Sequence, residues 1–224
     1  LIICKSRFVY LHILTKSGEN IAKKISNNLI IFPNIIKEGF YKKEDKIKDS
    51  FLISSRIIKR KNIDIAIKKV ISLNKKNIFI NVVGDGPELE ELKAKYKNQK
   101  EKVNFHGYVD RSEIHKYYTK SEYFINLSSS EGMSNALIEA MSFGCKCIVS
   151  NIPENKNTGG IYATYYNFRD DLFLLFKKAS ILNGQKVSNY ANHKYSLNSF
   201  KNRKIRELYK SWNLSYSQQE KDQG

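Results

Sequence analysis

From about residue 50 onward, short apolar runs alternate with segments that have the spacing of an amphipathic helix. Residues 78–83 are almost wholly apolar, which is typical of a strand that helices cover on both faces of a parallel sheet. Ahead of this run, Ile63, Ile67 and Val70 recur at the spacing of one buried helix face. This alternation predicts an α/β fold built on a doubly wound parallel sheet, the Rossmann-like arrangement.

The other segments follow the same scheme. We expect further strands at residues 29–32, 51–54, 103–105, 123–127 and 146–150. We expect further helices after Pro87, near residues 19–27, and over residues 112–118, 134–142, 172–182 and 200–212. Gly144 suits the C-terminal cap of the helix over residues 134–142. Ligands of doubly wound sheets bind beyond the carboxyl ends of the strands, so a site is expected in the loops that follow them.

The composition narrows the class of protein. Hydrophobic residues make up 41% of the 224 residues and aromatic residues 12%, which excludes a disordered polyelectrolyte. The formal charge is +17, but only seven basic residues are Arg, so the excess of Lys indicates a solvated surface and an anionic partner. Three cysteines are too few for a disulfide framework, and no group of side chains has the spacing of a metal site. No apolar run approaches the ~20 residues of a membrane span.

Two cations follow the strand expected at residues 51–54. Arg56 and Lys61 are five residues apart across a strand-to-helix turn, so both can reach one anionic group. Taken alone, a solvated basic turn explains them better. The Gly84-Asp85-Gly86 turn follows the next strand, where Gly lets backbone amides approach a ligand closely, although turn formation alone also explains it.

The loop at residues 128–135 is the most informative, because it joins a strand to a helix and carries one of two carboxylates eight residues apart, Glu131 and Glu139. Its small residues leave free amides at a helix N-terminus, which is a ready site for an anion. Carboxylates on either side accept hydrogen bonds from sugar hydroxyl groups. The apolar neighbours of Glu139 place it near the buried edge of the helix rather than on a solvated face.

Together these motifs resemble those of the retaining glycosyltransferases of family 4. Arg56…Lys61, Gly84-Asp85-Gly86-Pro87, Phe105-His106-Gly107-Tyr108-Val109 and Glu131-x7-Glu139 stand in the order and approximate spacing of that family. The resemblance covers about residues 30–150 and implies the C-terminal, nucleotide-sugar-binding domain of a GT-B fold. Asn62 departs from the pattern, since the family usually has Gly at this position.

The resemblance implies a role for each of these residues. Arg56 and Lys61 would neutralise the donor diphosphate, and Glu131 would bind donor-sugar hydroxyl groups; these three form the catalytic set. Glu139 would bind the ribose, and the backbone around Val109 the base. The full set expected to contact the donor comprises Gly84, Asp85, Gly86, Val109, Gly132, Met133, Ser134 and Glu139.

The resemblance also implies an organisation. Residues 1–49 would be the end of an N-terminal acceptor domain and a linker, charged over residues 42–50. Residues 50–195 would be the donor domain, and residues 196–224 a C-terminal helix and polar tail. Since the chain begins with Leu1 and includes only the end of an acceptor domain, we expect a piece of a longer enzyme that binds the donor and transfers slowly or not at all alone.

The implied reaction moves a hexose from a UDP- or GDP-sugar to a glycan or lipid-linked acceptor, in the synthesis of bacterial surface polysaccharide such as O-antigen or capsule. No Asp-x-Asp motif is present, so we expect no obligatory metal and no other cofactor. We expect a cytoplasmic location at the inner face of the membrane, where Lys residues would meet anionic lipids.

Three alternatives stay open. A sugar-nucleotide epimerase has the same fold but needs no acceptor, so product analysis separates it from a transferase. A basic nucleic-acid-binding domain would fit the charge, but the Lys residues are dispersed, no motif of that class is present, and we expect no nucleic acid as partner. The third is a non-catalytic subunit that kept the fold.

Overall fold

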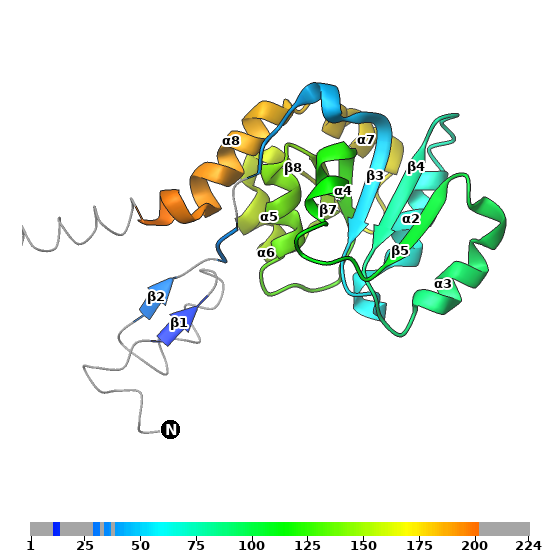
Figure 1. Cartoon of the computed structure of the whole chain (residues 1–224), viewed down its shortest axis with the longest axis horizontal. Helices are drawn as coiled ribbons and strands as arrows, with labels where there is room; N and C mark the ends of the chain where they lie inside the picture. The colour runs from blue at the N-terminus through cyan, green and yellow to red at the C-terminus, as the bar shows by residue number, and fades with distance from the viewer. Residues whose placement is uncertain (1–10, 14–28, 32–33, 37–38, 202–224) are drawn as a thin grey trace, which may run out of the picture.

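The computed structural model describes residues 11–13, 29–31, 34–36 and 39–201 (Figure 1). Six parallel strands form its main sheet in the order β5-β4-β3-β6-β7-β8. Their bounds are β3 Ile47–Ser54, β4 Phe79–Val83, β5 Val103–Gly107, β6 Ser121–Asn126, β7 Lys146–Ser150 and β8 Ala163–Tyr166. This order, with all neighbours parallel, confirms the predicted doubly wound, Rossmann-like α/β fold.

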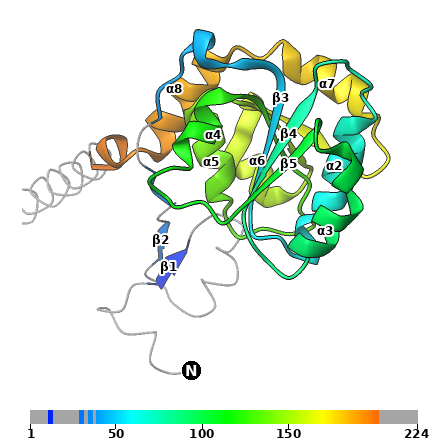
Figure 2. The same ribbon diagram turned by 45° about the vertical axis from the view of Figure 1, so that its right-hand side comes forward.

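Helices cover both faces of the sheet, and Figure 2 shows α2 and α3 on one side and α4, α5 and α8 on the other. One core cluster packs α2, α3 and α7 against the sheet, and a second packs α4, α5 and α8 against the opposite face. The helices are α2 Ile63–Ile71, α3 Leu89–Lys95, α4 His115–Lys120, α5 Asn135–Ser142, α6 Pro153–Gly159, α7 Leu172–Ser180 and α8 Gly184–Tyr195. Short 3-10 turns are η3 Lys43–Asp45, η4 Lys59–Lys61, η5 Lys97–Gln99 and η6 Gly160–Tyr162.

The chain reverses its direction across the sheet between β3 and β6. The helix after β3 (α2) packs on one face, and the helix after β6 (α5) packs on the other. Such a switch point opens a crevice at the carboxyl ends of the two strands, which here are Ser54 and Asn126. The loops expected to carry the site are those that leave these two strands.

Most of the expected elements are present, and two of them begin three or more residues away from the expected position. Strand β3 begins at Ile47 rather than at residue 51, because Ser50 is buried and its hydroxyl accepts the Glu122 N–H at 2.9 Å; the end of the expected charged connector is therefore strand. Helix α4 begins at His115 rather than at residue 112, because the carboxylate of Asp110 binds Ser112 and holds a turn there.

Several elements carried no clear sequence signal, namely α6, β8 and α8. Helices expected near residues 19–27 and 200–212 lie wholly or almost wholly outside the described residues. The N-terminal part contributes a two-stranded parallel sheet, β1 Leu11–Ile13 with β2 Leu29–Ile31. The segment after it returns to the main domain, where the Ile36 N–H donates to Tyr195 O at 3.1 Å. The division into segments at residues 49 and 195 stays a prediction.

Candidate functional site

The loop after β3 meets the loop after β6 through a buried ion pair. Lys61 Nζ lies 2.6 Å from Glu131 Oε1, and the two side chains are only 12% and 6% exposed. Burial alone would raise the pKa of Glu131, but the hydrogen bonds and charge of its polar neighbours, Lys61 foremost, outweigh it and hold that pKa below the ordinary value of 4.5. Glu131 is therefore a carboxylate at neutral pH, and its cation is already in place.

In the turn between β3 and α2, Asn62 stands at the position where glycine is typical of the family that the sequence resembles. Its backbone is left-handed, with φ 52° and ψ 40°, a conformation that Asn tolerates better than most residues. Its Nδ2 also donates to Leu127 O at 2.9 Å, which ties the turn to the end of β6. The departure at Asn62 therefore preserves the turn and adds a link between the two loops.

The turn formed by Gly84, Asp85 and Gly86 packs tightly against the loop that carries Arg56. A Cβ on Gly84, whose φ is +135°, would lie 1.8 Å from Ser55 O, and one on Gly86 would lie 2.2 Å from Ile57 O. In addition, the Ile57 N–H donates to Asp85 O at 2.8 Å. Chain packing alone thus requires glycine here, and contact of this turn with a donor stays a prediction.

The N-terminus of α5 presents unpaired amides beside Glu131. Ser134 caps the helix, and its hydroxyl accepts the Leu137 N–H at 3.3 Å. Among the described residues, the N–H groups of Gly132, Met133 and Ser134 have no acceptor. A Cβ on Gly132 would meet nothing within 4 Å, so the loop is open at this point. Such amides, with the positive end of the helix dipole behind them, suit an anion.

Only the backbone of Met133, and not its side chain, belongs to the group of free amides at the N-terminus of α5. The thioether packs against a small cluster of Ile36, Ile138 and Tyr195. Its Sδ also accepts the Asn34 N–H at 3.3 Å, and Asn34 Nδ2 donates to Asn135 Oδ1 at 2.6 Å. The segment before the main domain therefore touches the loop that precedes α5.

Glu139 lies in a different environment, at a cavity of about 520 Å³. Burial raises its pKa above the ordinary 4.5, and the Tyr118 hydroxyl and the charge of Arg111 offset this only in part. Tyr118 is 1% exposed, and its hydroxyl lies 3.2 Å from Ser54 Oγ at the end of β3. The cavity is lined by Phe40, Arg111, Ser112, Ile114, His115, Tyr118, Glu139 and Phe143.

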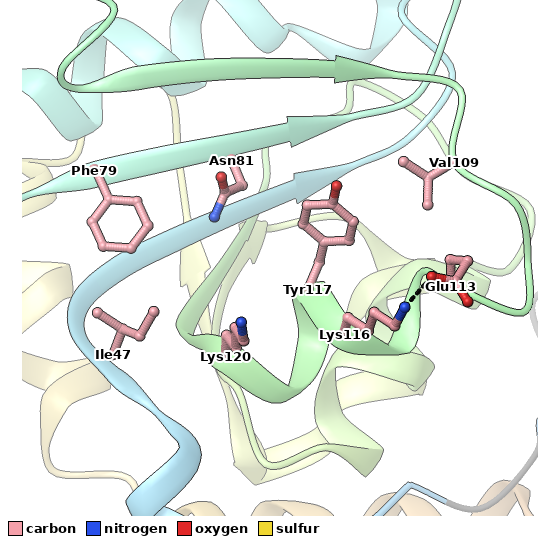
Figure 3. A pocket seen from close by; sticks show the side chains of 8 residues that line it. All are labelled: Ile47, Phe79, Asn81, Val109, Glu113, Lys116, Tyr117 and Lys120. Carbon is pink, nitrogen blue, oxygen red and sulfur yellow. Dashed lines mark hydrogen bonds and ion pairs between the residues drawn. The ribbon is translucent and has the colours of Figure 1, made fainter.

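The side chain of Val109 does not line that cavity. It lies at a second cavity of about 360 Å³, bordered by one face of α4 and by the first residues of β3 and β4 (Figure 3). The lining residues are Ile47, Phe79, Asn81, Val109, Glu113, Lys116, Tyr117 and Lys120. Because the two cavities take residues from opposite faces of α4, only the backbone near Val109 remains a candidate to contact a ligand beside Glu139.

The predicted residues are thus only partly brought together. Lys61 and Glu131 are in contact, whereas Arg56 is exposed at the start of its loop and has no side-chain partner among the described residues. Sequence reasoning missed Asn126 and Tyr118, which hold the two carboxylates. Asn126 did carry a signal, because it is a lone polar residue in the apolar run at 123–127.

Two further findings bear on the class of site. Within residues 11–13, 29–31, 34–36 and 39–201, no group of three or more His, Cys, Asp or Glu side chains is arranged to hold a metal ion. Within the same residues, no helix combines the length and the apolar character needed to cross a membrane. Cys145, just before β7, and Cys147, within it, are free and buried.

Known proteins match much of this chain in sequence. The family model described as Glycosyl transferases group 1 matches residues 35–159, more than half of the chain. The O-antigen biosynthesis glycosyltransferase WclY of Escherichia coli is 31% identical over 122 residues, which cover 52% of this chain and 33% of that protein. In Campylobacter jejuni, the N-acetylgalactosamine-N,N'-diacetylbacillosaminyl-diphospho-undecaprenol 4-alpha-N-acetylgalactosaminyltransferase is 33% identical over 108 residues, 47% of this chain and 29% of that protein.

Solved structures share the fold at low sequence identity. The pneumococcal O-GlcNAc transferase GtfA, in complex with UDP and GlcNAc, superposes with a TM-score of 0.68 at 18% identity. That superposition covers 93% of this chain but 45% of GtfA. The matched segment spans about a third of the length of the two curated relatives above.

Proposed function

Since the chain belongs to the group 1 glycosyl transferase family, we propose that it is the donor-binding part of a hexosyltransferase that uses a nucleotide-diphosphate sugar. The observation that carries this proposal is the buried Lys61–Glu131 pair beside unpaired amides at the N-terminus of α5. All of these groups lie at the switch point of the sheet, where ligands of this fold bind.

The charges fit the leaving group. Breaking a glycosyl–phosphate bond builds negative charge on the departing nucleotide, and preorganised cations and amides stabilise that charge. The Lys61 ammonium has three N–H donors and uses one on Glu131, so two remain for phosphate oxygens. Arg56 is exposed at the same loop and would supply the second cation.

The two carboxylates fit the hydroxyl groups of the donor. Glu131, held ionised, would accept hydrogen bonds from the sugar, and Glu139 would accept them from the ribose, with the base lying near the backbone of Val109. The acceptor would attack from the face of the leaving group, so that the anomeric configuration is retained. This scheme needs neither a protein nucleophile nor an obligatory metal, so donor binding should survive a chelator such as EDTA.

The assignment of an acceptor class is drawn from the relatives of this chain. Their names include O-antigen synthesis and transfer to a diphospho-undecaprenol carrier. By analogy we assign this chain to surface-glycan synthesis with a glycan or lipid-linked acceptor, at the cytoplasmic face of an anionic membrane. Binding to vesicles with anionic lipid that weakens with salt would support the membrane assignment, and equal binding to neutral vesicles would contradict it.

A thermal-shift panel of UDP-, GDP- and ADP-sugars tests the donor assignment. A ligand at a hundred times its Kd stabilises the folded chain by about 2.7 kcal/mol, which gives a readable rise in Tm. We expect a rise with one base only, and slow or absent transfer by this chain alone. No shift with any member of the panel would contradict the proposal. Release of an isomerised sugar without acceptor would instead identify an epimerase.

A further inference from the structure

Asn126, at the last position of β6, uses its whole hydrogen-bonding capacity on the loop that carries Glu131. The residue as a whole is only 7% exposed. Nδ2 donates to Glu131 Oε1 at 3.1 Å and to Ser134 Oγ at 3.4 Å. Oδ1 accepts from the Ser128 N–H at 3.0 Å and from Ser128 Oγ at 2.5 Å. A primary amide has two N–H donors and two acceptor sites, so all four positions are filled.

These four bonds connect the groups that the proposed function needs. The oxygen of Glu131 that accepts from Asn126 is also the one that binds Lys61, so the amide and the ammonium hold the same carboxylate oxygen. Ser134 is the N-cap of α5, and its position sets where the free amides of residues 132–134 lie. Ser128 begins the loop. One side chain therefore ties the start of the loop, its acid and the helix cap together.

Only an amide can make this set of contacts. An Asp at this position would keep the two bonds from Ser128 but would place a negative charge at hydrogen-bond distance from Glu131. An apolar side chain would lose every bond and leave buried polar groups without partners. A hydroxyl group is too short to reach both ends of the loop.

We infer that Asn126 is a positioning residue that fixes Glu131 and the N-terminus of α5 relative to each other, in the arrangement that binds a nucleotide-sugar donor. The inference rests on the proposed function for the identity of the ligand. The link between Asn126 and Glu131 can be measured without any donor, so the two claims fail separately.

The first experiment uses the unmodified chain. In a pH titration followed by NMR, the side-chain amide signals of Asn126 should move with the ionisation of Glu131, which has its own carboxyl signal. The movement should vanish in Glu131→Gln. Amide signals that do not follow the Glu131 carboxyl would overturn the inference, and this readout needs no variant of Asn126.

The second experiment compares Asn126→Asp and Asn126→Ala with Asn192→Asp. Asn192 is a matched control, because its Oδ1 accepts the Gly39 N–H and its Nδ2 donates to Gly39 O, away from Glu131. In Asn126→Asp the pKa of Glu131 should rise by about one unit or more, since a like charge is introduced beside it. The rise should be smaller in Asn126→Ala and absent in Asn192→Asp.

Donor binding supplies the final readout. The Kd for the nucleotide-sugar that stabilises the wild type should rise about tenfold in Asn126→Asp and stay within twofold in Asn192→Asp. If all three variants change the Glu131 pKa and the Kd equally, Asn126 is structural only and the inference is wrong. If the wild type binds no nucleotide-sugar while the Glu131 pKa follows Asn126, the proposed function fails and the coupling stands.

Discussion

Glu131 and Glu139 lie eight residues apart on one loop and helix, yet their surroundings are opposite. Glu131 accepts hydrogen bonds from a buried ammonium and from an amide, which lower its pKa. Glu139 borders a cavity beside Tyr118, where burial raises its pKa. The contrast indicates two different roles. Glu131 is a charge that Lys61 already neutralises within the folded chain, whereas Glu139 faces a cavity in which, in our proposal, hydroxyl groups of the ligand would donate to it.

The largest effect is expected from Lys61→Ala, which leaves the Glu131 carboxylate buried without its cation. The free energy of unfolding at pH 7 should fall by about 3 kcal/mol, as for other buried pairs that lose one partner. Donor affinity should fall by about a hundredfold or more. The nearby Lys59→Ala serves as the control, because Lys59 is exposed in the same turn, and it should change stability by less than about 0.5 kcal/mol. Equal effects of the two substitutions would remove the special status of the Lys61–Glu131 pair.

Gly84→Ala should act on the fold rather than on the ligand. The added Cβ would meet Ser55 O at 1.8 Å, and the backbone conformation is unfavourable for Ala, so a loss of about 2 kcal/mol in stability is expected. Gly132→Ala meets no atom and should leave Tm unchanged while weakening donor binding a few-fold. Chemical denaturation and donor titration of both variants measure the difference. A stable Gly84→Ala with weakened donor binding would reverse the assignment of that turn to packing.

Glu139→Gln should weaken donor binding about tenfold and abolish the pH dependence of the donor Kd that Glu139 causes. Ribose hydroxyl groups donate to the ionised carboxylate, so wild-type affinity should rise as pH increases through the pKa of Glu139, above the ordinary 4.5. The variant should show no such rise. Because the folded pKa is raised, the folded state holds its proton longer than the unfolded state, and wild-type stability relative to the variant should fall as pH rises through that window. A pH-independent wild-type Kd between pH 4.5 and 7 would argue against ribose binding at Glu139.

The smallest effect concerns Asn62. Asn62→Gly restores the residue usual in the family and relieves the left-handed conformation, but it loses the hydrogen bond to Leu127 O. The relieved backbone strain and the lost hydrogen bond have opposite effects on the free energy of unfolding and nearly cancel, so stability should change by less than about 1 kcal/mol. Asn62→Ala loses the bond and keeps the strain, and it should be the less stable of the two by thermal denaturation. Equal stability of both variants would show that the turn does not depend on the left-handed backbone.

The sequence predicted the fold class where periodicity was strong. The apolar run of β4 and the buried stripe of α2 were both found, because each pattern repeats over a whole element. The start of β3 was missed because its first residues, beginning with Ile47, are exposed or polar. Helix α8 was missed because its buried face includes Gly184, Ser188 and Tyr195 and so gives no clear aliphatic stripe.

The candidate site was predicted through its charged residues and only in part through its geometry. The Lys61–Glu131 contact joins residues 70 positions apart in the chain, and no local pattern reports such a distance. Gly84 looked like a ligand-contacting turn, yet the neighbouring backbone already requires it. Asn126 and Tyr118 act through side-chain hydrogen bonds that depend on which strands become neighbours.

The most direct test of the account is an amide NMR map of the chain as the best-stabilising nucleotide-sugar is added. We expect the largest shifts in the loop after β3 near Arg56 and Lys61, at the amides of residues 132–134, and around Glu139. Shifts confined to the second cavity, beside Phe79 and Lys120, or the absence of any shift, would contradict the placement of the donor at the carboxyl ends of β3 and β6.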